Sequence, residues 1–353
     1  MPFVPDLASG PVVIAIDPHK ASWTAVAVDT RLQPVASIRV PVNRDGYRQL
    51  WRFARRWPEA SWAIEGAAGL GAPLTTRLAA DGVQAVNVPA KLARRVRSLS
   101  TGHGRKTDEA DALSVGTAAL TATRLNATVI DEALAALRAV TEHRDDLVRT
   151  RTQTVKRVHV LLAQLIPSGL PRKLTAETAA AALRTIRPRT LLARTLRRLA
   201  VELLTDLRRL DRRITEATAT LSAAVTASGT TLTQLHGVGD VMAAKILAQT
   251  GSVSRFRSES AFASFCGVAP IEVSSGDVQR HRLSRAGDRQ LNYALHVMAM
   301  TQTQRPTSGR DYQRKRAARK THREAMRCLK RRLADVIFRT MLKDTETSLL
   351  PTP

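Results

Sequence analysis

Four acidic residues stand where folding could gather their carboxylates around one metal ion. Asp17 and Glu65 each close a short apolar, β-rich run and are therefore expected at the ends of buried strands. Asp108 and Asp111 stand three positions apart at the start of an expected helix, so both point to the same side. Carboxylates brought together repel one another unless a divalent cation neutralises them, and Mg²⁺ is the usual choice. Two ions held this way can activate a nucleophile and stabilise the leaving oxygen in phosphoryl transfer.

Any one of these acids, taken alone, is equally well explained as a helix cap, a turn residue or a surface residue. The set of four favours a metal site over that explanation. Glu109 points to another side of the helix and fits the set less well. The remaining turn acids are expected to be structural, namely Asp29, Asp45 and Asp81.

A second candidate centre lies far downstream, where Ser275 follows Ser274 and stands directly before Gly276 in an expected turn. A serine there could attack a phosphate, with arginine stabilising the charge of the transition state. A phosphate-binding loop or a plain surface loop explains the same residues, and these interpretations stay open. His281 is likewise either a base, a phosphate contact or a surface residue. The arginines around this turn are Arg280, Arg282 and Arg285.

The first two acids need a sheet to position them, and residues 11–125 have the pattern of one. Strand-like runs open the segment as a hairpin and then alternate with helical runs, which is typical of a mixed sheet with helices packed on it. A strongly basic stretch then precedes the helix that begins at Thr107 or Asp108. The expected strands are 12–16, 23–28, 38–42, 61–65 and 84–88, and the expected helices are 45–56 and 73–80. The basic residues are Lys91, Arg94, Arg95, Arg97, Arg105 and Lys106.

Residues 131–226 have no strand pattern and carry leucines at a heptad-like spacing on either side of the break at 167–171. This pattern predicts an antiparallel helical hairpin or coiled coil that could serve as an oligomerisation arm. An ordinary helical bundle is the alternative. The spaced residues are Val155, Val158, Leu162 and Leu165, then Leu196, Leu199, Leu203, Leu207, Leu210 and Ile214.

The C-terminal part opens with Gly237 and Gly239 ahead of an expected helix at 241–249, a pattern like a helix–hairpin–helix. Such glycines let backbone amides approach a phosphate at a helix N-terminus, although a tight turn between helices explains them as well. Residues 305–332 are basic and helical in pattern, and with few acids nearby we favour nucleic-acid contact over a solvated helix face.

The composition agrees with a nucleic-acid partner. The chain has 353 residues, 44% of them hydrophobic, a net charge of +25 and a pI near 11.4. Such a charge implies a polyanionic partner, with nucleic acid the default and an anionic membrane the other class. No apolar run approaches the roughly 20 residues of a spanning helix, and no signal peptide is seen. The two isolated cysteines, Cys266 and Cys328, exclude a disulfide framework and favour a reducing cytoplasm.

At this point the residues resemble a known family, the IS110 family of insertion-sequence transposases. Its GxDxxK-type opening is matched by Ile16–Lys20, and its K-T-D-x-x-D-A segment is matched in full by Lys106–Ala112. Its C-terminal domain is matched by the Gly237–Gly239 turn, by Phe265–Pro270 and by Ser284–Asp288. The chain departs from the family in carrying Arg285 and Asp288 for Lys and Asn. The acids in D-E-D-D order are Asp17, Glu65, Asp108 and Asp111.

The resemblance implies an α/β RNase H-like (RuvC-like) domain at 1–128, a helical coiled-coil arm at 129–228 and a mainly α C-terminal transposase domain at 229–353. It implies that the D-E-D-D acids bind Mg²⁺, with Mn²⁺ as a substitute. By motif, Ser275 would attack the DNA backbone to form a covalent phosphoserine linkage, with Ser274 as second choice. The acids and the serine would come together in one composite site.

The resemblance further implies a bridge RNA that pairs with donor and target DNA, and a homo-oligomer between dimer and tetramer. It places the protein in a prokaryotic cytoplasm, associated with the nucleoid and not with a membrane. The nucleic-acid contacts expected on the chain are Lys20, Arg94, Arg95, Arg97, Arg105, Lys106, Gly237, Gly239, Arg280, Arg282 and Arg285. Two alternatives are a RuvC-like two-metal structure-specific nuclease and a non-catalytic basic nucleic-acid-binding protein.

Overall fold

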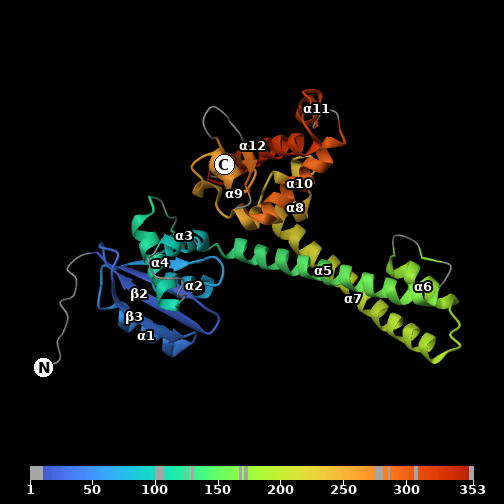
Figure 1. Cartoon of the computed structure of the whole chain (residues 1–353), viewed down its shortest axis with the longest axis horizontal. Coiled ribbons are helices and arrows are strands. Elements are labelled where there is room, and N and C mark those ends of the chain that lie inside the picture. Colours follow the sequence, from blue (N-terminus) through green and yellow to red (C-terminus); the bar gives the residue numbers. More distant parts are fainter. Residues whose placement is uncertain are drawn as a thin grey trace. The chain divides into compact units, whose positions relative to one another are not determined.

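The computed structural model of the chain describes residues 11–99, 107–123, 125, 127–128, 131–166, 169–170, 174–274, 281–284, 287–305 and 309–349. Two compact units make up the chain, Met1–Asp131 and Glu132–Pro353. Figure 1 shows strands gathered in the first unit and long helices in the second.

The first unit is built on one five-stranded mixed sheet of strand order β3-β2-β1-β4-β5. The first three strands pair antiparallel, whereas β4 pairs parallel to both β1 and β5. The expected mixed sheet is thus confirmed, and the strand at residues 61–65 has the expected bounds. The strands are β1 (Val13–Pro18), β2 (Ser22–Val28), β3 (Pro34–Pro41), β4 (Ser61–Glu65) and β5 (Ala85–Val88).

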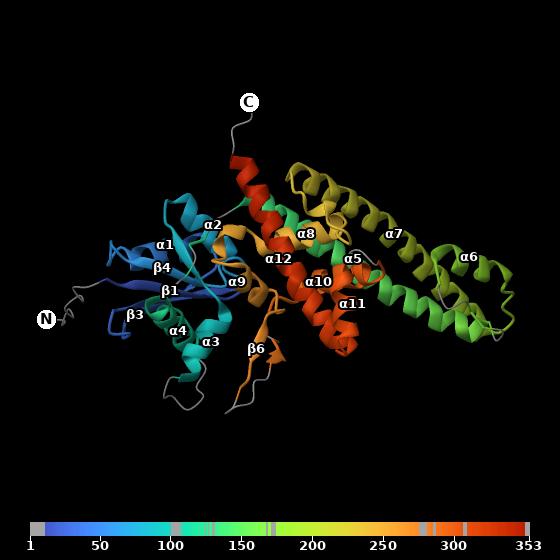
Figure 2. The same cartoon turned by 90° about the horizontal axis from the view of Figure 1, so that it is seen from above.

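Helices cover both faces of this sheet, as Figure 2 shows. Helices α1 (Arg44–Ala54) and α2 (Ala72–Ala80) pack on the face that carries Ile14, Ile16 and Ile64. Helices α3 (Ala90–Leu99) and α4 (Asp108–Thr121) pack on the opposite face, over Val13, Ala15 and Ala63. Since side chains alternate along a strand, the next odd-numbered residues, 17 and 65, belong to the face of α3 and α4.

Helix α3 was not expected from the sequence, in which residues 91–106 read only as a basic stretch. Its cationic side chains obscure a narrow apolar stripe of Leu92, Ala93 and Val96, which packs in the core beneath α3 and α4. Arg94 and Arg95 are exposed on the outer side of this helix.

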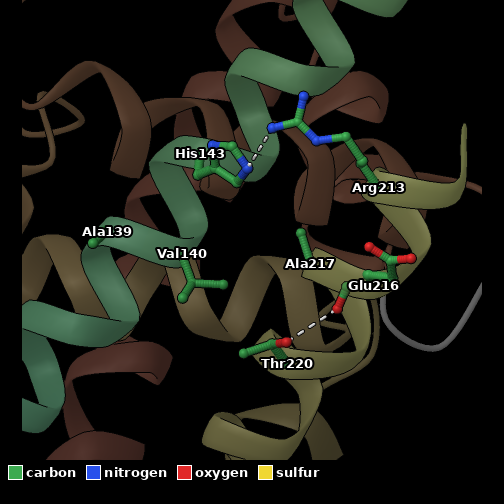
Figure 3. A pocket seen from close by; sticks show the side chains of 7 residues that line it. All are labelled: Ala139, Val140, His143, Arg213, Glu216, Ala217 and Thr220. Carbon is green, nitrogen blue, oxygen red and sulfur yellow. Dashed lines mark hydrogen bonds between the residues drawn. The ribbon is translucent and has the colours of Figure 1, made fainter. Parts of the chain in front are cut away.

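The second unit begins with two long helices, α5 (Glu132–Leu165) and α7 (Leu191–Ala227), which run antiparallel. Arg151 pairs with Asp211, and Arg144 Nε donates to Thr218 Oγ1 at 2.9 Å, so rising numbers on α5 meet falling numbers on α7. Figure 3 shows a third such contact, between His143 and Arg213, beside a hollow between the two helices. The helical hairpin predicted for residues 131–226 is therefore present.

The far end of the hairpin has a small core of its own, which the short helix α6 (Ala176–Thr185) completes (Figure 1). The buried positions of α7 there are Ala200, Leu204 and Leu207. Of the α7 positions that the heptad pattern favoured, Leu207 and Leu210 are buried, whereas Leu199 and Leu203 are only partly buried.

The near end of the hairpin belongs to the core of the C-terminal helices, to which Leu137 of α5 and Leu221 and Val225 of α7 contribute. The C-terminal region is mainly helical, as expected, but it also contains a small β-hairpin that the sequence did not suggest. Its helices are α8 (Asp240–Thr250), α9 (Glu259–Phe265), α10 (Arg289–Thr303), α11 (Arg310–Ala317) and α12 (His322–Leu349), with 3₁₀ turns η1 (Leu232–Gln234) and η2 (Val253–Arg255). The hairpin strands are β6 (Pro270–Glu272) and β7 (His281–Leu283).

Candidate active site

Two of the four predicted acids lie side by side at the carboxyl ends of neighbouring parallel strands. Ile16 of β1 is paired with Ile64 of β4, so Asp17 and Glu65, one residue further, are next neighbours. Neighbouring strands are about 4.8 Å apart, which brings both side chains over the same patch of the sheet. Asp17 is only 8% exposed, and Glu65 is partly buried.

The other two acids come from the first turn of α4, which the Thr107 side chain caps by accepting from the Ala110 N–H. This helix lies unusually close to the sheet, because a Cβ on Gly116 would come within 2.4 Å of the Val28 side chain. Asp111 is consequently buried, at 6% exposure, whereas Asp108 stays partly exposed at the rim.

The electrostatics show that three of the acids share one field. Burial raises the pKa of Glu65 above its ordinary value of 4.5, and the carboxylates of Asp17 and Asp111 raise it further. The nearby cations, Arg97 and His19, act in the opposite direction. A group of acids predicted from strand ends and a helix start is therefore brought together by the fold.

Three basic side chains accompany the acids. Arg97 of α3 pairs with Asp111, and Arg39 of β3 lies 3.1 Å from Asp108. His19 lies between two acids, with Nδ1 3.6 Å from Asp17 and Nε2 3.8 Å from Asp108. Sequence reasoning missed Arg39 and His19, although the position of His19 two residues after Asp17 was a usable signal.

The carboxylates offer the oxygen donors that Mg²⁺ prefers, but their arrangement does not fit the ion directly. Within the described part of the chain, no three His, Cys, Asp or Glu side chains are grouped closely enough to hold a metal ion. Asp111 and Asp108 instead face arginines. A cation could bind all four acids only if these ion pairs opened.

The predicted nucleic-acid contacts have different surroundings. Lys20 and Arg282 are exposed, like Arg94 and Arg95, whereas Arg97 faces Asp111. Gly237 has φ +89° and packs against Met298 and Thr301 of α10, which gives it a structural reason to be glycine. Gly239 begins α8 with open space around it. Four predicted contacts lie outside the described residues: Arg105, Lys106, Arg280 and Arg285.

The predicted nucleophile Ser275 also lies outside the described residues. The second choice, Ser274, is exposed just after β6, and its hydroxyl donates to Glu272 Oε1 at 2.8 Å. Glu272 was not singled out from the sequence. Strand β6 therefore leads directly to a hydrogen-bonded pair of a serine and a carboxylate, Ser274 and Glu272.

Comparison with known proteins decides the family. A family model described as a transposase, DEDD_Tnp_IS110, matches residues 14–167. A second model, described as a transposase of the IS116/IS110/IS902 family, matches residues 229–314. The chain belongs to the IS110 family of insertion-element transposases. The four acids of this transposase lie in the first matched region, and Ser274 and Ser275 lie in the second.

Full-length relatives agree with that assignment. The transposase is 26% identical to the insertion element IS116 uncharacterized 44.8 kDa protein of Streptomyces clavuligerus, over 94% of each chain. It is 28% identical to the insertion element IS110 uncharacterized 43.6 kDa protein of Streptomyces coelicolor, again over 94% of each chain. In the described part of the transposase, no helix is long and apolar enough to cross a membrane.

Proposed function

We propose that this transposase recombines DNA through a covalent serine intermediate formed with the help of the D-E-D-D acids. The observation that carries the proposal is the convergence of Asp17, Glu65 and Asp111 on one face of the sheet, where they share an electrostatic field. The mixed strand order and the helices on both faces are consistent with an RNase H-like fold for this domain. Mg²⁺, with Mn²⁺ as a substitute, is the cation proposed for the acids; it would bind once the Arg97–Asp111 and Arg39–Asp108 pairs open and would supply charge neutralisation there.

The serine step conserves the energy of the phosphodiester bond. The oxygen of Ser275, or of Ser274, forms a bond to phosphorus while one P–O bond of the DNA breaks and the departing sugar oxygen takes up a proton. Attack on the phosphoserine by the hydroxyl of another strand then restores the serine and joins the new ends. No external oxidant, reductant or nucleotide is needed. Arginines beside the serine would stabilise the transition-state charge.

The partners proposed are donor DNA, target DNA and a bridge RNA that selects both. The net charge of +25 and the exposed arginines of α3 and β7 support contacts to phosphate and sugar. Binding of this kind weakens steeply with salt. The α5–α7 arm is proposed to hold a homo-oligomer of two to four chains, acting in the cytoplasm at the nucleoid.

The test is a recombination assay with purified protein, DNA carrying the element's joined ends, a target duplex and RNA transcribed from the element's non-coding end. Recombinant product is expected with Mg²⁺ and RNA present, and it should vanish after RNase treatment or chelation. Asp17→Asn should abolish it, whereas the exposed control Asp45→Asn should not. Product that forms without RNA would reject the guided mechanism.

The alternative is a structure-specific nuclease that uses only the acidic site. Under that alternative, Ser275→Ala, Ser274→Ala and the double variant would all retain Mg²⁺-dependent cleavage of branched DNA. Under our proposal, cleavage is lost in the variant that lacks the nucleophile and in the double variant.

A further inference from the structure

The two ends of the β6–β7 hairpin are joined backbone to backbone. Gly267, with φ +69°, leads into β6, and Gly287 follows β7. A Cβ on Gly287 would lie 2.2 Å from both Cα and N of Gly267, so a side chain there would force the backbone to shift. The Asp288 N–H also donates to the Phe265 carbonyl oxygen at 2.7 Å. We call these residues, Phe265–Gly267 and Gly287–Asp288, the clasp.

Two side chains complete the clasp. Asn292, in the first turn of α10, donates through Nδ2 to the carbonyl oxygens of Cys266 at 3.0 Å and Gly267 at 3.2 Å. Its Oδ1 accepts from Lys330 Nζ of α12 at 2.6 Å. An ammonium group is a donor only, so Lys330 fixes which way the amide of Asn292 points.

A lysine would be an unusual residue at position 330 if its role were only to fill space. It is partly buried, and burial lowers the pKa of its ammonium group. Among the described residues no carboxylate forms an ion pair with it, and the neighbouring Cys266 thiol, whose pKa burial raises to about 12, stays neutral. A half-desolvated cation is costly, and a neutral Met or Gln would fill the same space at lower cost. The hydrogen bond to Asn292 is what the lysine adds.

A hairpin of this size needs such a support. Its strands have three residues each, and short two-stranded hairpins are marginally stable alone. Its ends meet at two glycines, which supply little side-chain packing of their own. The bonds of Asn292 to the clasp therefore add to the backbone contacts that hold the base of the hairpin.

We infer that Asn292 and Lys330 are positioning residues for the covalent step: they fix the orientation of the β6–β7 hairpin, whose first strand leads to Ser274, the sequence neighbour of Ser275. This inference rests on the serine chemistry proposed above. Misplacement of a nucleophile by about 1 Å can slow a reaction roughly 100-fold. A change at Lys330 should accordingly act on the rate of adduct formation and leave DNA affinity in place.

The experiment measures the rate of serine–DNA adduct formation at saturating DNA, together with DNA affinity, in the full chain with its RNA. Lys330→Met and Asn292→Ala should each slow adduct formation roughly 10- to 100-fold with unchanged affinity. The double variant should be no slower than the slower single variant, because each single variant already disrupts the same hydrogen-bonded unit of Lys330 and Asn292. Lys330→Arg, which keeps a charged donor, should restore most of the rate. Lys343→Met, at an exposed lysine of the same helix, should match the wild type.

Four results would overturn the inference. Normal rates with weakened DNA affinity would make Lys330 a DNA contact, and additive effects in the double variant would separate the two residues. A wild-type rate in Lys330→Met would show that the bond to Asn292 has no role in catalysis. If the wild type forms no adduct at all, the proposed function fails and this inference with it. An adduct that depends on the serine but not on Lys330 rejects the inference alone.

Discussion

The acidic site and the clasp both place a cation against a polar group, but for opposite reasons. Arg97 meets Asp111 where three carboxylates influence one another, so it relieves an excess of negative charge. Lys330 meets the neutral amide of Asn292, so it orients a hydrogen bond and neutralises nothing. A metal ion can take over the first task but not the second. A cation that faces a carboxylate can therefore be replaced by a metal ion, whereas one that faces a neutral amide cannot.

The largest effect should come from removing an acid from the first region. Asp17→Asn deletes one carboxylate from the shared field and should reduce recombination on the order of 10³-fold, with little effect on folding. Recombination assays test the loss of activity, and thermal unfolding of the same preparation tests that the fold is kept. If the variant unfolds instead, the acid is structural and the contrast with the clasp fails.

The next largest effect should be a loss of protein stability, caused by a substitution in the clasp. Gly287→Ala would force a methyl group into the Gly267 backbone and should destabilise the protein by about 2–4 kcal/mol. Gly239→Ala is the matched control, since nothing lies within 4 Å of the added carbon and its φ is −91°. Denaturant unfolding of both variants measures the difference. Equal stability of the two variants would mean that the clasp is looser than described.

The closeness of Asp17, Glu65 and Asp111 could be predicted from the sequence because its signals are local. Strand ends, a Thr cap and an i, i+3 pair can each be found within a few residues, and sheet register then brings them together. The partners were not predictable in this way. Arg97 reads as one of several basic residues until α3 is seen to pack on α4. The clasp joins residues near 266, 287 and 330, whose closeness depends on how three helices pack. Periodic patterns in the sequence do not indicate contacts of this kind.

If a metal ion can replace Arg97 beside Asp111, removal of this arginine should have a third, smaller effect. Arg97→Gln leaves Asp111 without its cation and should lower metal-free stability by about 1–2 kcal/mol, since the pair is only partly exposed. The same change should strengthen Mn²⁺ binding roughly tenfold, because the ion no longer displaces an arginine. Titration calorimetry with Arg94→Gln as the exposed control measures this. Weaker Mn²⁺ binding in Arg97→Gln would show that the arginine helps to build the site.

The smallest effect is a pH dependence at Glu65. Its pKa is raised in the folded protein by burial and by its acidic neighbours, so the unfolded chain loses this proton first as the pH rises. Stability of the metal-free wild type should therefore fall as the pH rises above 4.5, the ordinary value of this carboxyl group. Glu65→Gln should be more stable than the wild type at neutral pH and equal to it in acid. Thermal melts in a chelator across this range test the sign, and a stability gain confined to acid pH would contradict it.

The central claim is that a serine on the C-terminal hairpin forms the DNA linkage with the help of the acids of the first unit. Its most direct test is mass spectrometry of the protein after reaction with the element's DNA, RNA and Mg²⁺. We expect one nucleotide-bearing peptide that contains Ser274 and Ser275, and we expect it to be absent in Asp111→Asn. Cleaved DNA without any such peptide, or a linkage on another residue, would contradict it.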